Sequence, residues 1–224
     1  MNGQPFIDVG WISDHLDLIW TRFIQHAELT VIPVVLGFAI SLVIGILVMR
    51  RQTSYGIVIA VAGILYTVPS LAAYVLMARV LGLTLLVAVI PLTTYTLLIL
   101  IRAIVAGFRS VPPDVLEAAE GMGYTARQRL LRVELPLAMP LMITGIRLAT
   151  VTTIGLATVA ALLGDQFGGF GQFLTEGIQT FFATKIYLGA GLSVIFAIAA
   201  DILLVQVERL VTPWARGRTR AEAR

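Results

Sequence analysis

Cysteine is absent from this chain, and histidine and lysine are scarce. Without cysteine the chain can form neither a disulfide nor a thiolate metal site. The two histidines, His15 and His26, precede the first long apolar stretch without a cluster of other ligands, so we expect no metal site. The single lysine, Lys185, lies in the sequence ATKIY, which excludes a glycine-rich phosphate loop ending in Gly-Lys-Ser/Thr.

Charged residues are also few. Only 13% of the 224 residues are charged and 58% are hydrophobic, with a mean hydropathy of +0.92. A soluble domain of this size needs more polar surface, so the apolar stretches indicate membrane spans. The pI near 9.6 does not point to nucleic acid, because the arginines lie between apolar stretches and form no basic face with interleaved aromatics. The expected environment is a lipid bilayer, with no nucleic-acid partner.

Five apolar stretches are long enough to cross a hydrocarbon core, which takes about 20 helical residues. Three uncharged runs of 21, 27 and 22 residues come before residue 102, and two more spans follow a polar insertion. The predicted fold class is all-α, a polytopic membrane protein with about five transmembrane helices. The expected transmembrane domain is 29–210, with spans at about 29–49, 56–78, 82–101, 137–163 and 186–208.

The two ends of the chain are expected to lie outside the bilayer. In residues 1–28, apolar side chains recur at helical spacing between aspartates, which predicts an external amphipathic leader helix. A partly ordered leader is the alternative. Residues 211–224 are predicted to form a basic cytoplasmic tail.

Arginine and lysine placement predicts the orientation. With the N-terminus outside and the C-terminus inside, twelve of the sixteen basic residues fall on the inner side, as the positive-inside rule requires. Those twelve are Arg50, Arg51, Arg102, Arg109, Arg127, Arg129, Arg132, Arg209, Arg216, Arg218, Arg220 and Arg224. The same count places the polar insertion between the third and fourth spans in the cytoplasm.

The insertion contains EAAEGMGYTARQRLLRVELP at 117–136. Prolines and an aspartate at 112–114 predict the start of a short helix, which Gly121 and Gly123 would end. A second helix is expected to begin at Thr125, with Gln128 three residues on as a capping box. Two short helices that meet at a glycine would make a rigid protrusion; on composition alone an ordinary interfacial linker would be the favoured interpretation.

The spacing within this stretch resembles the EAA loop of bacterial ABC importer permeases. That pattern is Glu-Ala-Ala, three residues, Gly, nine residues and Ile-x-Leu-Pro. The matching positions are Glu117, Ala118, Ala119, Gly123, Val133, Leu135 and Pro136, with valine in place of the isoleucine.

The resemblance implies a function and a set of partners. Residues 103–136 would be the coupling loop, which sits in a groove of a cytoplasmic ATPase subunit that binds ATP and Mg. This chain would then be a non-catalytic permease of the bacterial inner membrane, without a cofactor of its own. Its other partners would be a second permease chain, identical or related, and an external substrate-binding protein. An enzyme is not expected, because the spans hold no histidine or cysteine and their serines have no evident partner.

Three stretches, at 66–77, 117–128 and 152–165, look most like the osmoprotectant permeases of this family, which import glycine betaine, carnitine and choline. The segment FGGFGQFL at 167–174 is bulkier than that resemblance leads one to expect. A permease for methionine or another amino acid is the main alternative. A membrane scaffold without transport activity is a more distant one.

Two further sets of residues are candidates for the site. Aromatic rings suit a quaternary ammonium, so Tyr66, Tyr74 and Tyr95, with Pro69 between the first two, are predicted to line the substrate path; packing or interface anchoring is the alternative for each tyrosine. Charges inside a membrane are costly and usually paired. Arg147 and Asp201 have compatible depths, which predicts a structural ion pair, unless each faces a watery cavity or a partner subunit.

Overall fold

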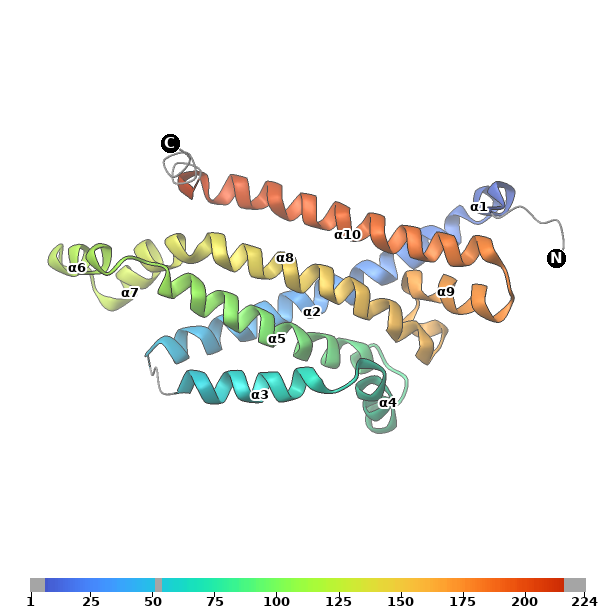
Figure 1. The fold of residues 1–224 in the computed structure, drawn as a ribbon, viewed down its shortest axis with the longest axis horizontal. Coiled ribbons are helices and arrows are strands. Elements are labelled where there is room, and N and C mark those ends of the chain that lie inside the picture. The colour runs from blue at the N-terminus through green and yellow to red at the C-terminus, as the bar shows by residue number, and fades with distance from the viewer. Residues whose placement is uncertain (1–6, 51–53, 216–224) are drawn as a thin grey trace.

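The computed structural model describes residues 7–50 and 54–215, and all regular elements within them are helical (Figure 1). The predicted all-α, polytopic class is confirmed, since four helices, or five with one bent pair counted as a span, are long and apolar enough to cross a membrane. Most of the predicted basic tail and the start of the predicted leader lie outside the described residues. The helices are α1 (Val9–Asp14), α2 (Leu16–Arg50), α3 (Tyr55–Thr67), α4 (Ser70–Leu81), α5 (Leu86–Arg109), α6 (Pro113–Gly121), α7 (Ala126–Arg129), α8 (Leu135–Ala160), α9 (Gly169–Gln179) and α10 (Ala183–Val211).

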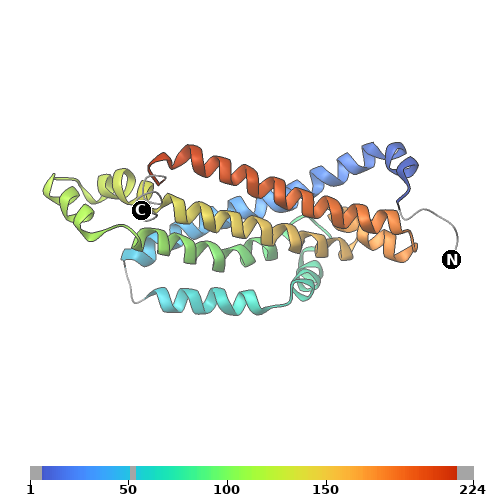
Figure 2. The same ribbon diagram turned by 45° about the horizontal axis from the view of Figure 1, so that its top comes forward.

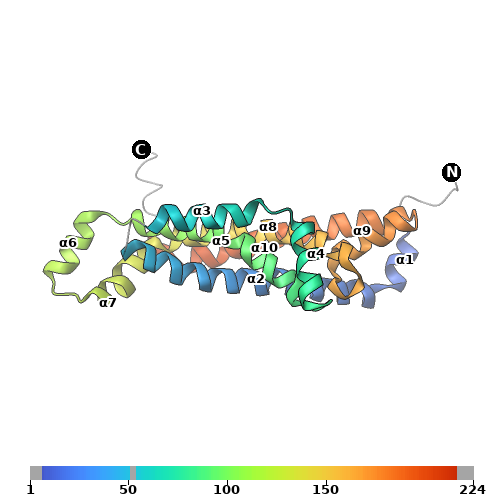
Figure 3. The same cartoon turned by 90° about the horizontal axis from the view of Figure 1, so that it is seen from below.

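The long helices α2, α5, α8 and α10 run lengthwise through the molecule, with the shorter α3 alongside them (Figures 1 and 3). Helices α6 and α7 protrude at one end, where α2 and α10 also finish; we call this the loop end. Helices α1 and α9 lie at the other, the α9 end. Figure 2 shows α3 and α10 on opposite sides, with α5 and α8 between them. The inserted segment and the N-terminal helix therefore lie at opposite ends of the bundle.

The predicted boundary at residue 28 between an external leader and the first span is not visible in the structure. Helix α2 begins at Leu16 and continues unbroken to Arg50, with Pro33 inside it. No proline or glycine lies between residues 16 and 32 to end the helix. In addition, His26, Leu29 and Thr30 are buried against the rest of the bundle. Tertiary packing thus draws half of the predicted leader into the first long helix.

The predicted second span, 56–78, is two helices that meet at an angle of 88°. The break falls at Val68 and Pro69, where both residues have extended ψ angles of 125° and 132°. A residue before proline is driven toward this conformation by contact with the proline ring. The Tyr95 hydroxyl donates a hydrogen bond to the freed carbonyl of Val68 at 2.8 Å, which satisfies it within the apolar surroundings.

Helix α5 is the central helix, with apolar clusters along its length. One cluster toward the α9 end joins α5 to α2, α4 and α8 through buried residues that include Leu29, Tyr74 and Leu92. The helix axes approach closely because small residues lie at the contacts: a Cβ on Gly37 would overlap Thr96, and one on Gly145 would overlap Ala103. The outward sides of α2, α3 and α10 remain apolar and exposed, as expected of surfaces that contact lipid.

Candidate functional site

Helix α6 carries the first half of the inserted segment. Pro112 precedes it in an extended conformation, Pro113 is its first residue and Asp114 lies in its first turn, as the sequence predicts. Ala119 is its one buried residue, whereas Glu117 and Ala118 are exposed. A helix that buries a single methyl group leaves nearly its whole surface free for another molecule.

Gly123 ends this helix through its backbone conformation. Its φ angle is +78°, in the left-handed region that glycine adopts without strain. The Tyr124 amide donates to the Ala119 carbonyl at 3.1 Å, and the Gly123 amide donates to the Glu120 carbonyl at 2.9 Å. These two bonds form a Schellman cap. The backbone conformation of the turn therefore requires the glycine of the motif. Packing does not require it, because a Cβ at Gly123 would meet open space.

The second half of the segment begins with the predicted capping box. The Thr125 hydroxyl accepts from the Gln128 amide at 3.3 Å, and the Gln128 side chain accepts from the Thr125 amide at 2.8 Å. Helix α7 then passes through a π-helical turn, Leu130–Glu134, directly into α8. The insertion is consequently continuous with a membrane-spanning helix, and no flexible linker separates them.

Arg129 ties the two halves of the segment together. Its guanidinium bonds the carboxylate of Glu120 at the end of α6, and its Nε donates to Glu134 Oε1 at 2.8 Å. In the sequence this arginine is only one of twelve basic residues predicted on the inner side. The five-residue spacing between Arg129 and Glu134 falls on one side of a helix only in a π-turn, so an α-helical interpretation of the sequence would miss it.

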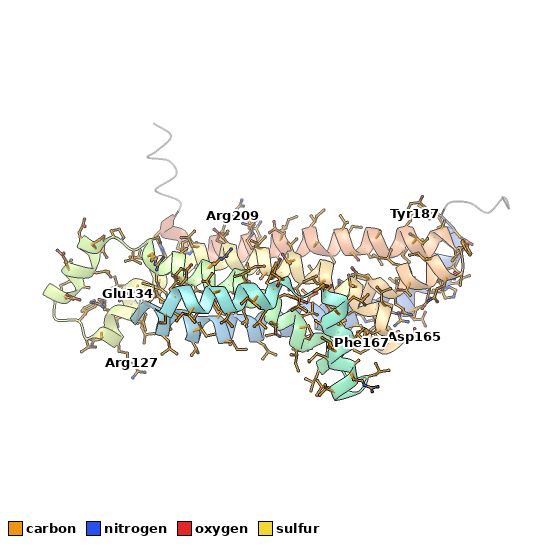
Figure 4. All side chains as sticks on the ribbon, turned by 60° about the horizontal axis from the view of Figure 1, so that its bottom comes forward. Arg127, Glu134, Asp165, Phe167, Tyr187 and Arg209 are labelled. Carbon is orange, nitrogen blue, oxygen red and sulfur yellow. The ribbon has the colours of Figure 1, made fainter. Side chains whose placement is uncertain are left out.

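The remaining motif residues lie where the insertion meets the bundle. Val133, Leu135 and Pro136 are half-buried. A cavity of about 410 Å³ separates the insertion from α2 and α5; its lining includes Leu116, Arg129 and Glu134. In Figure 4, Arg127 lies at the outer edge of the insertion and Glu134 at its junction with the long helices, whereas Asp165, Phe167 and Tyr187 lie toward the α9 end. The segment is thus a protrusion with a hollow beneath it.

The predicted path residues fall into two groups. Tyr74 is fully buried and its hydroxyl donates to the Leu156 carbonyl at 3.1 Å, and Tyr95, which holds Val68, is only 4% exposed. Tyr66 is 39% exposed and packs edge-on against Tyr95, with ring centroids 5.9 Å apart. Pro69 is exposed at the bend between α3 and α4. Of the three rings, only that of Tyr66 has a substantial free surface.

Arg147 and Asp201 lie together, joining α8 to α10. The arginine donates two hydrogen bonds to the carboxylate, at 2.8 and 3.0 Å. A second acid, Glu208, lies 3.5 Å from the same guanidinium and was missed by sequence analysis. Asp201 and Glu208 are seven residues apart, so they occupy the same side of α10, which is the signal that could have identified the second acid.

At the α9 end one glutamate serves two cations. Glu176 accepts a hydrogen bond from Lys185 at 2.6 Å and lies 3.6 Å from Arg22. Burial alone would raise the pKa of Glu176, but the hydrogen bond and charge of Lys185, with further contributions from Gln172 and Arg22, lower it. Among the residues that the structure describes, no group of three or more histidines or acids could hold a metal ion.

The chain is similar to permeases of known transport systems. A family described as "Binding-protein-dependent transport system inner membrane component" matches residues 37–213. The choline transport system permease protein OpuBB of Bacillus subtilis (strain 168) is 33% identical over 189 residues, which cover 84% of this chain and 86% of that protein. The glycine betaine/carnitine/choline transport system permease protein OpuCB of the same organism is 34% identical with the same coverage. The osmoprotectant import permease protein OsmW of Salmonella typhimurium (strain LT2) is 32% identical over 92% of this chain and 97% of its own length.

The fold is similar to that of a solved transporter. A structure of the methionine ABC transporter MetNI in an inward-facing conformation matches with a TM-score of 0.76 and 24% identity, covering 89% of this chain and 98% of that one. Sequence and fold therefore agree, and the predicted resemblance to ABC importer permeases is confirmed. The chain belongs to the family of inner membrane components of binding-protein-dependent transport systems, as a multi-pass protein of the bacterial inner membrane.

Proposed function

We propose that this chain is the transmembrane subunit of an ATP-driven importer for quaternary ammonium osmoprotectants such as glycine betaine, carnitine and choline. The observation that carries the proposal is the inserted segment: its EAA motif forms a capped helix that protrudes from the bundle with Glu117 and Ala118 exposed. The sequence relatives named above are permeases for these solutes. The likeness to the methionine transporter supports the fold alone, so the amino-acid alternative has less support.

Coupling would use the continuity of the inserted segment with the long helices. An ATPase that grips α6 would act through the Schellman cap, Arg129 and the π-turn on α8. The ATPase subunits would bind ATP and Mg and perform the hydrolysis, and this chain would contribute no catalytic residue. This assignment requires the loop end to face the cytoplasm, which the distribution of arginines favours.

The other proposed partners follow from the architecture. The chain has at most five spans among its described residues, with α3 and α10 on opposite sides of the bundle. A closed path would need a second permease chain, identical or related, and an external binding protein would deliver the solute at the α9 end. Tyr66 is the one predicted path tyrosine whose ring has a substantial free surface.

The test is uptake by the complete importer in liposomes, with ATP supplied on the side of the ATPase. We expect ATP-dependent uptake of radiolabelled glycine betaine or choline that unlabelled methionine does not inhibit. Glu117→Lys should abolish uptake and release the ATPase during purification without reducing the yield of the membrane chain. The matched control is Asp17→Lys, which reverses an exposed charge near the start of α2, toward the α9 end.

Two results would contradict the proposal. Uptake of methionine without uptake of any quaternary ammonium solute would establish the amino-acid alternative. Retention of both the ATPase and full uptake by Glu117→Lys would remove the coupling role of α6.

A further inference from the structure

A hollow between α3, α5 and α8 contains a positive charge that the residues around it leave unneutralised. The hollow has a volume of about 470 Å³, within the ~300–1,000 Å³ range of small-molecule sites. Its ten lining residues are mostly apolar, with Tyr66 from α3, Arg102 from α5 and Thr144 from α8 as the polar members. None of the ten is acidic, and no described carboxylate lies within ion-pair distance of the exposed Arg102.

The position of Arg102 along the helix makes this charge unusual. Arg109, seven residues further on, lies 4.6 Å from the centre of the Tyr55 ring at the start of α3, and Tyr95, seven residues before, meets Tyr66 near the end of α3. Each interval of seven residues is about 10 Å of helix. Arg102, which the sequence predicts to lie on the inner side beyond the third span, therefore lies level with the middle of α3, because α5 continues to Arg109. An unpaired guanidinium within an apolar bundle is costly unless water or an anion reaches it.

The two polar ends of the hollow suit opposite charges. A guanidinium binds a carboxylate through charge-assisted hydrogen bonds, whereas the exposed face of a tyrosine ring attracts a quaternary ammonium. The long arginine side chain can extend along the apolar wall toward the tyrosine. A molecule with both groups would neutralise Arg102 and cover Tyr66 at once. Choline has the ammonium without the carboxylate.

We propose that this hollow binds zwitterionic quaternary ammonium solutes, with their carboxylate on Arg102 and their ammonium against Tyr66, and that Arg102 makes it prefer them to choline. The proposal rests on the proposed function and adds a site and a selectivity to it. Two other occupants compete with this proposal. One is an acidic side chain of a second permease chain that neutralises Arg102, and the other is a simple anion.

The absence of cysteine permits a direct test that does not depend on the external binding protein. Ala106 is exposed in the lining one helical turn from Arg102, so Ala106→Cys places a single thiol in the hollow. The rate of its reaction with N-ethylmaleimide, a neutral reagent, would be measured in the assembled importer with glycine betaine, choline or acetate. Ala72→Cys, at an exposed position on α4 outside the hollow, is the control for general effects of each solute.

We expect glycine betaine to give half-maximal protection at a concentration about tenfold lower than choline does. One charge-assisted hydrogen bond would supply an affinity difference of about this size. Adding Arg102→Gln should raise the concentration of glycine betaine needed for half-maximal protection about tenfold and leave that of choline unchanged. Arg102→Lys should give an intermediate concentration for glycine betaine. Arg79→Gln removes an exposed arginine of α4 outside the hollow and should change neither value.

Several outcomes would overturn the inference. These are equal protection by choline and glycine betaine, protection by acetate as strong as by glycine betaine, absence of protection, or glycine betaine protection that survives Arg102→Gln. Uptake by the unmodified importer separates this failure from that of the proposed function. If glycine betaine is imported while the thiol stays unprotected, only the site is wrong; if no quaternary ammonium solute is imported, the proposed function fails as well.

Discussion

Short helices lie at both ends of the molecule, but the charges and the apolar contacts that hold them differ between the two ends. At the loop end a single arginine, Arg129, is shared by two glutamates, and α6 buries only Ala119. At the α9 end a single glutamate, Glu176, is shared by Lys185 and Arg22, and α9 buries six residues, among them two phenylalanines. The charges at the two ends are reversed in sign, and α9 is packed into the apolar interior whereas α6 is not.

This difference separates two ways of making a segment rigid. Helix α9 is fixed by contact with α2, α8 and α10, so most of its side chains pack against other parts of the chain. Helix α6 is held by its C-terminal Schellman cap and by the contact of Glu120 with Arg129, which act at one end of the helix and leave its face free. Caps and ion pairs at the ends of a segment can therefore keep a partner-binding surface rigid while it remains exposed.

The largest effect is expected from disturbing the packed end. A Cβ on Gly171 would overlap the carbonyl oxygen of Thr158 and lie 2.8 Å from that residue's Cα, and a backbone cannot move aside as a side chain can. We expect Gly171→Ala to destabilise the protein by roughly 1–3 kcal/mol, measured as a lower melting temperature in detergent. Gly155→Ala, at a helical glycine with open space around it, is the matched control; equal melting temperatures for the two variants would refute the packing account of α9.

A smaller and more local effect is expected from the cap of α6. Gly123→Val puts a β-branched residue at φ +78°, at a cost of about 1–2 kcal/mol, whereas Gly123→Asn is better tolerated there. We expect the valine variant to lose ATP-driven uptake while its melting temperature stays near that of the unmodified protein. The asparagine variant should keep most of the uptake. If both variants transport normally, the cap has no role in coupling.

The ion pairs of Arg129 should contribute less still, because partly exposed pairs are worth about 0.2–1 kcal/mol. Arg129→Gln should speed hydrogen exchange of the α6 amides and leave the long helices unchanged. Arg127→Gln removes an exposed charge from the same short helix and provides the comparison. Similar exchange in both variants would show that the caps alone hold the insertion.

The smallest effect concerns pH at the α9 end. The pKa of Glu176 is below its ordinary value of 4.5, so the folded protein binds this proton less tightly than the unfolded chain does. The resulting stabilisation is complete above the ordinary pKa and is lost as the pH falls through the lowered one. Glu176→Gln and Lys185→Met should each flatten the acid decline of the melting temperature. An unchanged decline in both variants would show that this pair does not contribute.

Sequence patterns predicted one end of the molecule better than the other. The caps of the insertion depend on neighbours within five residues, so Gly123, Thr125 and Gln128 could be assigned from spacing alone. The segment FGGFGQFL at 167–174 stood out in the sequence only for its bulk, although Gly171 lies inside α9 against Thr158. That contact depends on how two helices pack, which no local pattern records.

The same distinction explains the tyrosines and the bend. Tyr74 and Tyr95 suited a cation by their chemistry, but their hydroxyls bond backbone carbonyls of other helices. The sequence predicted one span over 56–78, yet the chain bends by 88° at Val68 and Pro69, where Tyr95 of another helix bonds the Val68 carbonyl. Composition predicted that these residues lie in the membrane, and only tertiary contacts decided what each side chain does there.

The π-turn at Leu130–Glu134 has a mechanical consequence. Because it joins α7 to α8 without a break, the insertion and α8 would move together as one rigid, bent unit. Helix α8 is about 39 Å long, so a tilt of about 5° at the loop end would carry its far tip through about 3 Å. That tip contacts α9 at Gly171. A small displacement of the insertion would therefore be transmitted across the whole thickness of the bilayer.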